Sequence, residues 1–490
     1  MQRRKLLLAA AAFPLLLHHS ATAQNIDSLT SQNSSGPAVV YSIQQCIDSA
    51  LKNNPTVKTS EFTERTAKVQ YIQQVGNMLP TLSAYGQYLN NGGRSVNTVT
   101  YTYVTANYNQ GYGQIQGAIP LWNGGSIQNF IRQYSLAYDA DKKDWQYQKD
   151  LMTIQIILAY LSALSSEEQL ALAQSQAADI RHKVELMEIQ DSVGAISPTD
   201  LTDMKGQYNA SQLTVVNTKN TLETNKLNLA QLMNVPYSPN MELVKLNLDP
   251  TPVLYNATVD QVYQNATKNI ASVAAASLHV ASAVKGVKAT RGNMAPTLYL
   301  YYGMYSNYST AASTAPQIGT NYKQDGSYVT VNGSQVPINF SQAIMGNPVA
   351  VPFGTQFNNN INTSVGLELN IPILNHLNYR TLYNQARVNL DQAIFNQKTI
   401  SSSLRQAVES NYVQMMQAFR TYNVTYKQVQ NYEESFRGAQ IKYDAGALKS
   451  LDFVIYNTNK NNAELNMIAA KYGYILQTKI LDYYQGQLTW

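Results

Sequence analysis

Cysteine is almost absent from this chain, whose 490 residues include only Cys46. One cysteine cannot form an intramolecular disulfide, so a disulfide-stabilised framework is excluded. Cys46 lies inside a helical pattern, where a free cysteine usually behaves as a small apolar residue. We therefore expect a buried side chain without a redox or catalytic role.

Charged residues are also scarce, at 13% of the chain, and 35 Lys and Arg face 30 Asp and Glu. Arg3, Arg4 and Lys5 lie in a segment that we expect to be removed, which lowers the formal net charge from +5 to about +2. Nucleic-acid binding normally needs a concentrated basic surface. The composition therefore favours no nucleic-acid partner.

Histidine is rare too, and beyond the N-terminal leader only His182, His279 and His376 occur. They are scattered and lack the spacing of metal ligands, so we expect solvated or packed side chains and no metal site. The chain also has no nucleophile elbow and no phosphate-binding glycine loop. These absences argue against an enzyme and predict no cofactor.

Long hydrophobic runs are missing, except for a short run in the leader. Arg3, Arg4 and Lys5 precede apolar residues 6–17, and small residues follow at 21–23. This pattern predicts a secretory signal peptide over residues 1–23, exported by the general route rather than the twin-arginine route. No later segment reaches the roughly 18 apolar residues of a membrane helix, so any membrane-spanning part must consist of strands.

A large internal duplication is the main positive feature of the sequence. The phrase from Gly76 to Leu82 recurs 216 residues later, from Gly292 to Leu298. Two further landmarks recur at an interval of 252 residues, and one of them is the segment 194–200, which returns as 446–452. The second copy is 36 residues longer, and all of the extra length lies between Pro296 and Pro372, where we expect a surface loop.

Each copy is predicted to contain two strands with period-two alternation. In the second copy, Val365, Leu367 and Leu369 point to one side, while polar residues between them point to the other. An apolar outer face and a wet inner face fit a membrane strand, and half-buried strands of a soluble sheet are the alternative. Tyr-, Asn- and Gly-rich loops at 90–110 and 307–362 favour the membrane. The predicted strands are 79–90, 112–121, 295–306 and 363–374.

Helical patterns fill the rest of each copy. Leu151, Ile154, Leu158 and Leu161 follow the three-four spacing of a coiled-coil seam. The long patterns would each extend about 100 Å at 1.5 Å per residue, and the shorter helices, placed end to end, nearly match them. We therefore expect four helical columns per chain. The predicted helices are 42–77, 126–190 and 198–233 in the first copy, and 258–293, 378–442 and 451–485 in the second.

A single chain with these elements is incomplete. Four strands cannot close a membrane barrel, which needs about eight or more so that no edge faces lipid. Identical chains related by cyclic symmetry can close one together. Three chains would give twelve strands and twelve helical columns, although the sequence indicates an oligomer more firmly than it indicates a trimer.

The signal peptide, duplicated strand pairs, long helical hairpins and glycine-containing hairpin tips together resemble the TolC family of outer membrane efflux proteins. The resemblance covers residues 41–486. It implies a mainly α protein with a transmembrane β portion, in which three chains complete a 12-stranded β-barrel and a periplasmic α-barrel. It also implies a Gram-negative outer membrane location and a passive exit duct of a tripartite efflux or type I secretion system. The implied partners are outer membrane lipid, a periplasmic adaptor and an inner-membrane pump.

The resemblance also suggests a domain plan. Residues 24–40 form an N-terminal linker, and residues 41–233 form the first repeat with its long hairpin at 126–233. Residues 234–257 form an inter-repeat segment, and residues 258–490 form the second repeat with its hairpin at 378–485. The linker, the inter-repeat segment and the C-terminal end are expected to form an equatorial collar.

The hairpin tips are where we expect an adaptor to dock. Gly194 and Gly446 can supply a positive φ at each helix reversal, and an acidic residue follows six positions later in both copies, Asp200 and Asp452. Helix capping alone could explain these acidic residues, since the helix dipole favours them. The expected docking residues are Gly194, Ala195, Ile196 and Ser197 in the first tip, and Gly446, Ala447, Leu448 and Ser450 in the second.

The resemblance further implies a gate that closes the periplasmic end. In similar proteins the Thr-Asp pair matched here by Thr199 and Asp200 contacts a tyrosine matched by Tyr443. An arginine that normally joins them is replaced by Leu448, and the adjacent Lys449 could substitute for it. Asp452 matches one position of an acidic ring, which symmetry would repeat around the pore, but the other position holds Ile455.

A periplasmic coiled-coil scaffold or binding protein without a pore is the alternative function. The sequence does not identify the cargo, the adaptor or the energy source of the pump, because a tunnel lined by polar groups has no pocket to interpret.

Overall fold

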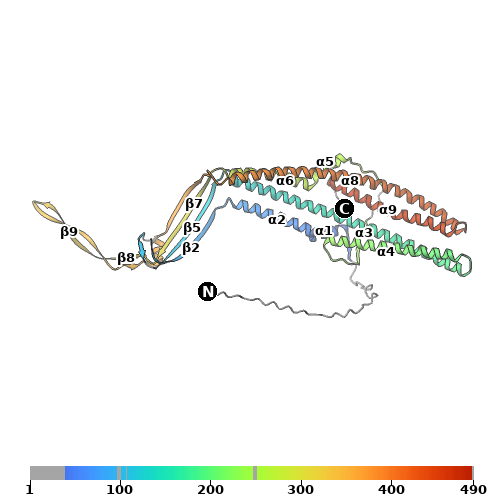
Figure 1. Cartoon of the computed structure of the whole chain (residues 1–490), viewed down its shortest axis with the longest axis horizontal. Coiled ribbons are helices and arrows are strands. Elements are labelled where there is room, and N and C mark those ends of the chain that lie inside the picture. Colours follow the sequence, from blue (N-terminus) through green and yellow to red (C-terminus); the bar gives the residue numbers. More distant parts are fainter. Residues whose placement is uncertain (1–38, 97–100, 106, 247–250, 488–490) are drawn as a thin grey trace, which may run out of the picture.

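The computed structural model describes residues 39–96, 101–105, 107–246 and 251–487. The expected signal peptide 1–23 and nearly all of the linker 24–40 lie outside the described residues. The molecule is strongly elongated, with a bundle of long helices at one end, a sheet beside it and a thin β-hairpin at the far end (Figure 1). This shape agrees with the mainly α fold with a β portion that the sequence predicts.

The long hairpins occur once in each repeat and are identical in length. Helices α3 (Ser126–Ser192) and α8 (Asn378–Asp444) have 67 residues each. Helices α4 (Pro198–Met233) and α9 (Ser450–Gln485) have 36 each. The long helices end two residues later than the sequence pattern indicates, and each extends about 100 Å.

The shorter helical patterns 42–77 and 258–293 are each broken into two helices, contrary to the prediction of one. In the first repeat, α1 (Ile43–Asn53) gives way to α2 (Pro55–Gly76) at Asn54, whose side chain accepts a hydrogen bond from the Thr56 amide at 2.9 Å. Pro55 has no amide hydrogen to donate, so it is tolerated at the start of a helix and favours the break. The equivalent pair in the second repeat is α5 (Val259–Asn269) and α6 (Ala271–Gly292).

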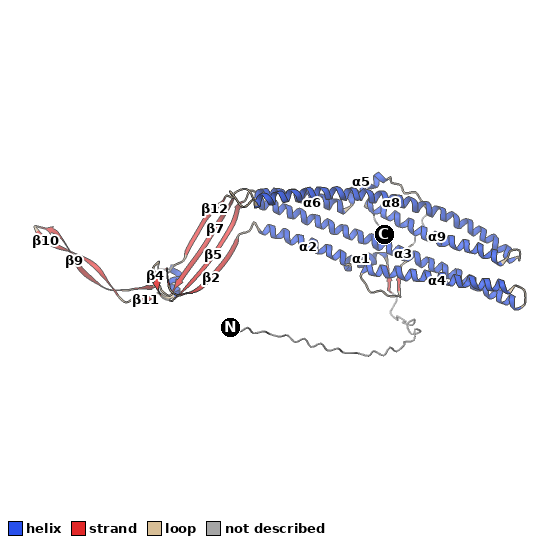
Figure 2. Cartoon of the chain, viewed as in Figure 1, coloured by secondary structure: helices blue, strands red, loops and turns tan. Residues whose placement is uncertain are grey.

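The helices form a layered bundle (Figure 2). Helices α2, α3, α6 and α8 pack side by side in that order, and α4 and α9 pack against α3 and α8. The short helices α1 and α5 contact α4 and α9, so short elements lie end to end beside each long helix. This arrangement agrees with the four columns expected from the element lengths.

Four antiparallel strands form the main sheet, in the order β12, β7, β5, β2. Their register places Leu82, Leu300 and Leu367 on one face, together with other apolar residues. The opposite face carries Gln114, Gln116 and a stack of tyrosine rings. The two-faced pattern predicted for Val365, Leu367 and Leu369 therefore extends across the sheet, which leaves β2 and β12 as edges. The bounds are β2 (Thr81–Asn91), β5 (Tyr108–Trp122), β7 (Thr297–Ser309) and β12 (Asn362–Asn370).

The segments expected to be loops, 90–110 and 307–362, contain further regular structure, so that prediction is wrong. The largest addition is a hairpin of β9 (Gln317–Val331) and β10 (Ser334–Met345) that projects beyond the sheet (Figure 1). Asn332 and Gly333 both have positive φ at its turn, as a two-residue hairpin turn requires. The remaining additions are β3 (Arg94–Val96), β4 (Tyr103–Thr105), β8 (Ser313–Thr314), β11 (Val349–Ala350) and α7 (Phe353–Asn359).

The main core lies midway along the bundle. Short strands β1 (Val39–Tyr41) and β6 (Met241–Leu243) pair in parallel there, and the Tyr160 hydroxyl lies 3.1 Å and 2.8 Å from the carbonyls of Tyr41 and Val244. Cys46 is fully buried in this core, as predicted, and burial raises the pKa of its thiol to about 12.

The predicted seam on α3 is only partly correct. Leu161 is buried, but Leu158 is 43% exposed in the single chain. Other residues of α3, including Ile156 and Ile157, fill the core instead. A strict three-four pattern fails here because α3 packs against several helices and not against one partner.

Candidate functional site: the two hairpin tips

Both hairpins reverse direction through the same backbone geometry. Gly194 and Gly446 have φ values of 68° and 70°, in the left-handed region that glycine adopts without strain. The amides of Ala195 and Ala447 each donate to a carbonyl five residues earlier at 2.8 Å, which closes the end of the long helix. The glycines predicted from the repeat therefore have the expected structural role.

The returning helices begin differently in the two tips. Ser197 caps α4, since its hydroxyl accepts a hydrogen bond from the Thr199 amide at 3.2 Å. The equivalent position in the second tip is Lys449, which is exposed and has no side-chain cap bond. Asp200 and Asp452 both lie in the first turn and are exposed, so the helix dipole favours their negative charge.

The position at which the sequence resemblance implies an arginine holds an apolar side chain in both tips. Leu448 is half-buried, and so is its equivalent in the first repeat, Ile196, which packs against the apolar cluster of that hairpin. The repeat therefore uses this position for packing inside the turn. Lys449, one residue later, is an exposed cation at the start of the returning helix.

Each tip is stabilised internally by an apolar cluster. The first consists of Val184, Met187, Leu201 and Met204. In the second, Phe453 is only 1% exposed and stacks on Tyr443 with ring centroids 4.6 Å apart. Phe453 is the repeat equivalent of Leu201, so one buried position anchors the returning helix in both hairpins.

The two hairpins also contact each other within one chain. Val454 of α9 packs against the apolar cluster of the first tip. Lys183 of α3 places its Nζ 3.8 Å from the centroid of the Phe453 ring, a cation–π contact. Burial lowers the pKa of Lys183 to about 8. Neither Lys183 nor Phe453 was among the predicted site residues, although the equivalence of Phe453 with Leu201 could have indicated that position.

The predicted gate residues lie at the tips. Within one chain they do not form the expected contacts. In the part of the chain that the structure describes, no hydrogen bond joins Tyr443 to Thr199 or Asp200. Asp200 instead lines a hollow of about 310 Å³ together with Asp203, Gln207 and other residues of the first tip, and Val454 of α9 closes one side of it. A gate contact between Tyr443 and the first hairpin would therefore have to form elsewhere, and neighbouring chains are the natural place for it.

The tips also expose apolar side chains at equivalent positions. Ile189 and Ile441 occupy the same place in the two repeats, and each is 64% exposed. Val193, next to the first reversal, is exposed as well. The equivalent positions of Ile189 and Ile441 make these side chains candidate contacts for another molecule.

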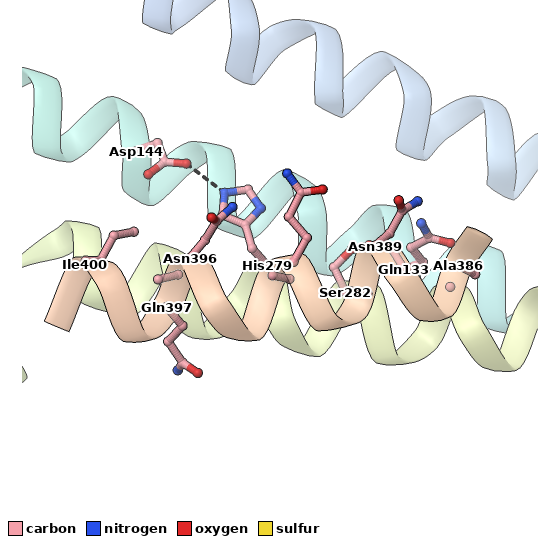
Figure 3. Close-up of a pocket in the computed structure, with 14 residues that line it drawn as sticks. Gln133, Asp144, His279, Ser282, Ala386, Asn389, Asn396, Gln397 and Ile400 are labelled. Atoms are coloured by element: carbon pink, nitrogen blue, oxygen red, sulfur yellow. Dashed lines mark hydrogen bonds and ion pairs between the residues drawn. The ribbon is translucent and has the colours of Figure 1, made fainter. Parts of the chain in front are cut away.

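A second polar cluster lies far from the tips, between α3 and α6. The prediction that His279 is an isolated side chain is wrong, because its Nε2 lies 2.9 Å from Oδ2 of Asp144 (Figure 3). This pair raises the pKa of His279, and the hydrogen bond that its ring donates to the Asp144 carboxylate is the largest cause. His182, in contrast, is exposed, as expected.

No single described helix is both long and apolar enough to cross a bilayer. Taken together, α5 and α6 meet the criterion of length and composition, but they are bent by 53° where they meet.

Comparisons with known proteins agree with this architecture. The family model described as outer membrane efflux protein matches residues 46–235 and 262–482, one match in each repeat. Outer membrane protein TolC of Escherichia coli is 22% identical over 443 residues, which cover 89% of this chain and 80% of TolC.

Solved structures show the same fold. The outer membrane protein VceC of Vibrio cholerae superposes with a TM-score of 0.68 at 12% identity, covering 91% of this chain and 96% of VceC. The open-state MtrE outer membrane channel of Neisseria gonorrhoeae gives a TM-score of 0.66 at 15% identity, covering 91% and 89%. The chain belongs to the outer membrane efflux protein family, whose members are channel proteins of the Gram-negative outer membrane.

Proposed function

We propose that this protein is a trimeric exit duct of a tripartite efflux or type I secretion system, a passive channel that a periplasmic adaptor opens at the hairpin tips. One observation carries the proposal. An open sheet with an apolar face continues into a bundle of long helices, which ends in two matched reversals. The sheet suits lipid at one end of the molecule, and the tips suit a protein partner at the other (Figure 2).

The trimer follows from surfaces that one chain leaves uncovered. Strands β2 and β12 are edges of the sheet, and an unpaired edge cannot face lipid. The outer helices of the layer, α2 and α8, expose large apolar side chains, among them Phe62 and Phe395. Three chains would pair their edges into twelve strands and cover these helices against one another.

The domain plan supports this assembly. Strands β1 and β6 join the linker 24–40 to the inter-repeat segment 234–257 midway along the bundle. The Tyr255 hydroxyl contacts Asp482 near the C-terminal end at 3.0 Å. We assign these segments to an equatorial collar and residues 1–23 to a signal peptide that directs export.

We assign the adaptor-docking surface to the two tips. The backbone turns at 194–197 and 446–450 form the end of the molecule, and Ile189 and Ile441 offer equivalent apolar contacts beside them. Lys449 adds an exposed cation to the second turn only. An adaptor docked on the tips would bury this apolar pair, and a contact with Lys449 would distinguish the second tip from the first.

Photocrosslinking in intact cells tests this function. A photoreactive residue at Lys449 should capture a periplasmic adaptor from assembled trimers. The matched control places the same residue at Lys323, an exposed position on β9 at the opposite end of the molecule. We expect no adaptor from the control site. Assembled protein that crosslinks no adaptor from position 449 would contradict the docking assignment and favour a channel that acts alone.

A further inference from the structure

A mixed set of carboxylates and imidazole lies where the two repeats meet. Asp141 and Asp144 are one helical turn apart on α3 of the first repeat, and His279 faces them from α6 of the second. One atom from each side chain can be chosen so that all three lie within 4.8 Å of one another. No function of the hairpin tips uses this cluster.

The cluster carries more negative than positive charge. His279 pairs with Asp144, but among the described residues Asp141 has no hydrogen-bond or ion-pair partner, although its carboxylate is half-buried. Two half-buried carboxylates share a single imidazole here, so the cluster has a net negative charge that favours a cationic ligand.

The space around the cluster allows an ion and its water to enter. Asp144 and His279 line a hollow of about 490 Å³ between α3, α6 and α8 (Figure 3). On the other side of α3, Asp141 and Asp144 line a second hollow of about 500 Å³ that is bounded by Pro55 and Thr59 of α2. Asp144 thus lies at the junction of both hollows, which leaves room for solvent ligands.

We propose that Asp141, Asp144 and His279 form a binding site for a divalent transition metal ion of the Zn²⁺ class. One imidazole nitrogen and two carboxylate oxygens suit such ions, with water at the remaining positions. Ligand atoms about 2.0–2.2 Å from a shared ion lie about 3–3.5 Å apart.

Binding would connect the two repeats. Helices α3 and α6 are neighbours in the layer but come from different copies of the duplicated unit, and the ion would bridge them. A ligand that binds only the folded protein stabilises it, so the metal should raise the unfolding temperature.

The test uses the full-length protein, purified in detergent, freed of affinity tag and treated with a chelator that is then removed. Titration with Zn²⁺ is followed by calorimetry, and thermal unfolding is measured with and without the ion. We expect saturable binding of one ion per chain and a higher unfolding temperature. The variant H279Q should weaken binding by at least about tenfold.

Two further variants separate metal binding from the His279–Asp144 ion pair. D141N leaves that pair intact and removes only the unpartnered carboxylate, so it should also weaken Zn²⁺ binding. H182Q removes an exposed histidine elsewhere on α3 and should leave binding unchanged. Absence of saturable binding, or equal affinity in D141N, H279Q and the unmodified protein, would overturn the proposal and leave an ordinary surface ion pair.

Discussion

At the scale of single residues, the duplication makes chemical differences between the tips visible. Leu201 and Phe453 occupy equivalent buried positions, yet only the aromatic ring offers a face to a cation. Lys183 uses that face, so the two hairpins of one chain are joined by a group that repeat symmetry would not predict. Sequence patterns identify the shared positions, whereas such a contact depends on how two helices far apart in the chain meet.

Lys183 should make stability depend on pH in a defined window. Its pKa is lowered to about 8 from the ordinary 10.5, mainly because burial penalises the charged form. The free-energy cost of burying this charge is complete below pH 8, where Lys183 carries its proton in both the folded and the unfolded chain. It disappears between about pH 8 and 10.5, because the folded chain releases its proton first.

Replacement of this charge tests the assignment. K183M should raise the unfolding temperature at pH 7 by an amount worth less than about 1 kcal/mol, since water still reaches the ammonium group. This increase in unfolding temperature should become smaller toward pH 10, because the unmodified protein then no longer buries a charge. Calorimetric scans at both pH values check this, with K219M on the exposed face of α4 as the control. A loss of stability at pH 7 would show that the contact with Phe453 outweighs the cost of burial.

At the scale of elements, helix ends could be predicted more reliably than the segments between strands. Pro198 and Gly194 mark the turn of the first hairpin through backbone rules that hold in any context. The break before Pro55 follows the same rules and could have been predicted. The break at Ile270 has no proline, so it depends on packing that a sequence pattern does not contain.

The β9–β10 hairpin shows why the second strand-to-strand segment was misjudged. Polar and apolar residues alternate in it, but a high content of Tyr, Asn and Gly suggested a loop. The Asn332-Gly333 pair between two alternating stretches is a strong hairpin signal. Two strands alone are marginally stable in water, so this element contributes little to the stability of the rest.

Removal of this hairpin should therefore leave the channel intact. The Gly346 amide donates to the Pro316 carbonyl at 2.8 Å, so a short Asn-Gly turn can replace residues 317–345 without moving the flanking chain. Gel mobility of heated and unheated trimers should match that of the unmodified protein. Dissociation of the shortened protein at a clearly lower temperature would mean that the hairpins hold the chains together.

A nearby substitution provides the contrast. Gln356 of α7 is buried. Its side chain accepts a hydrogen bond from the Ser309 amide and donates one to the Ser309 carbonyl, both at 2.9 Å. Q356A would remove these two hydrogen bonds and a third to the Val351 carbonyl at 2.8 Å, at a cost of about 0.5–1.5 kcal/mol for each bond. The same heating assay should detect this loss, which shows that it can report damage at this end of the sheet.

At the scale of the whole molecule, one chain leaves the edges of its main sheet and the apolar faces of its outer helices uncovered, and the proposed trimer would cover them with further copies. The overall plan could be predicted because lengths and spacings repeat in the sequence. The gate at the hairpin tips stays a prediction, because Thr199, Asp200 and Tyr443 share no hydrogen bond within the described chain. Contacts that close a pore on its axis join different chains, so neither one sequence nor one chain contains their geometry.

The gate assignment nevertheless has a clean test. The Tyr443 ring packs on Phe453, and Y443F keeps that stacking while removing only the hydroxyl. D200A removes an exposed carboxylate and should change stability by less than about 0.5 kcal/mol. If the hydroxyl and the carboxylate hold neighbouring hairpins together, the double variant should have a larger single-channel conductance in planar bilayers.

Y208F, which removes the hydroxyl of a half-buried tyrosine in the first tip, is the control and should conduct like the unmodified protein. Unchanged conductance in the double variant would leave these residues a capping role and place the constriction elsewhere, with the Asp452 ring as the next group to remove.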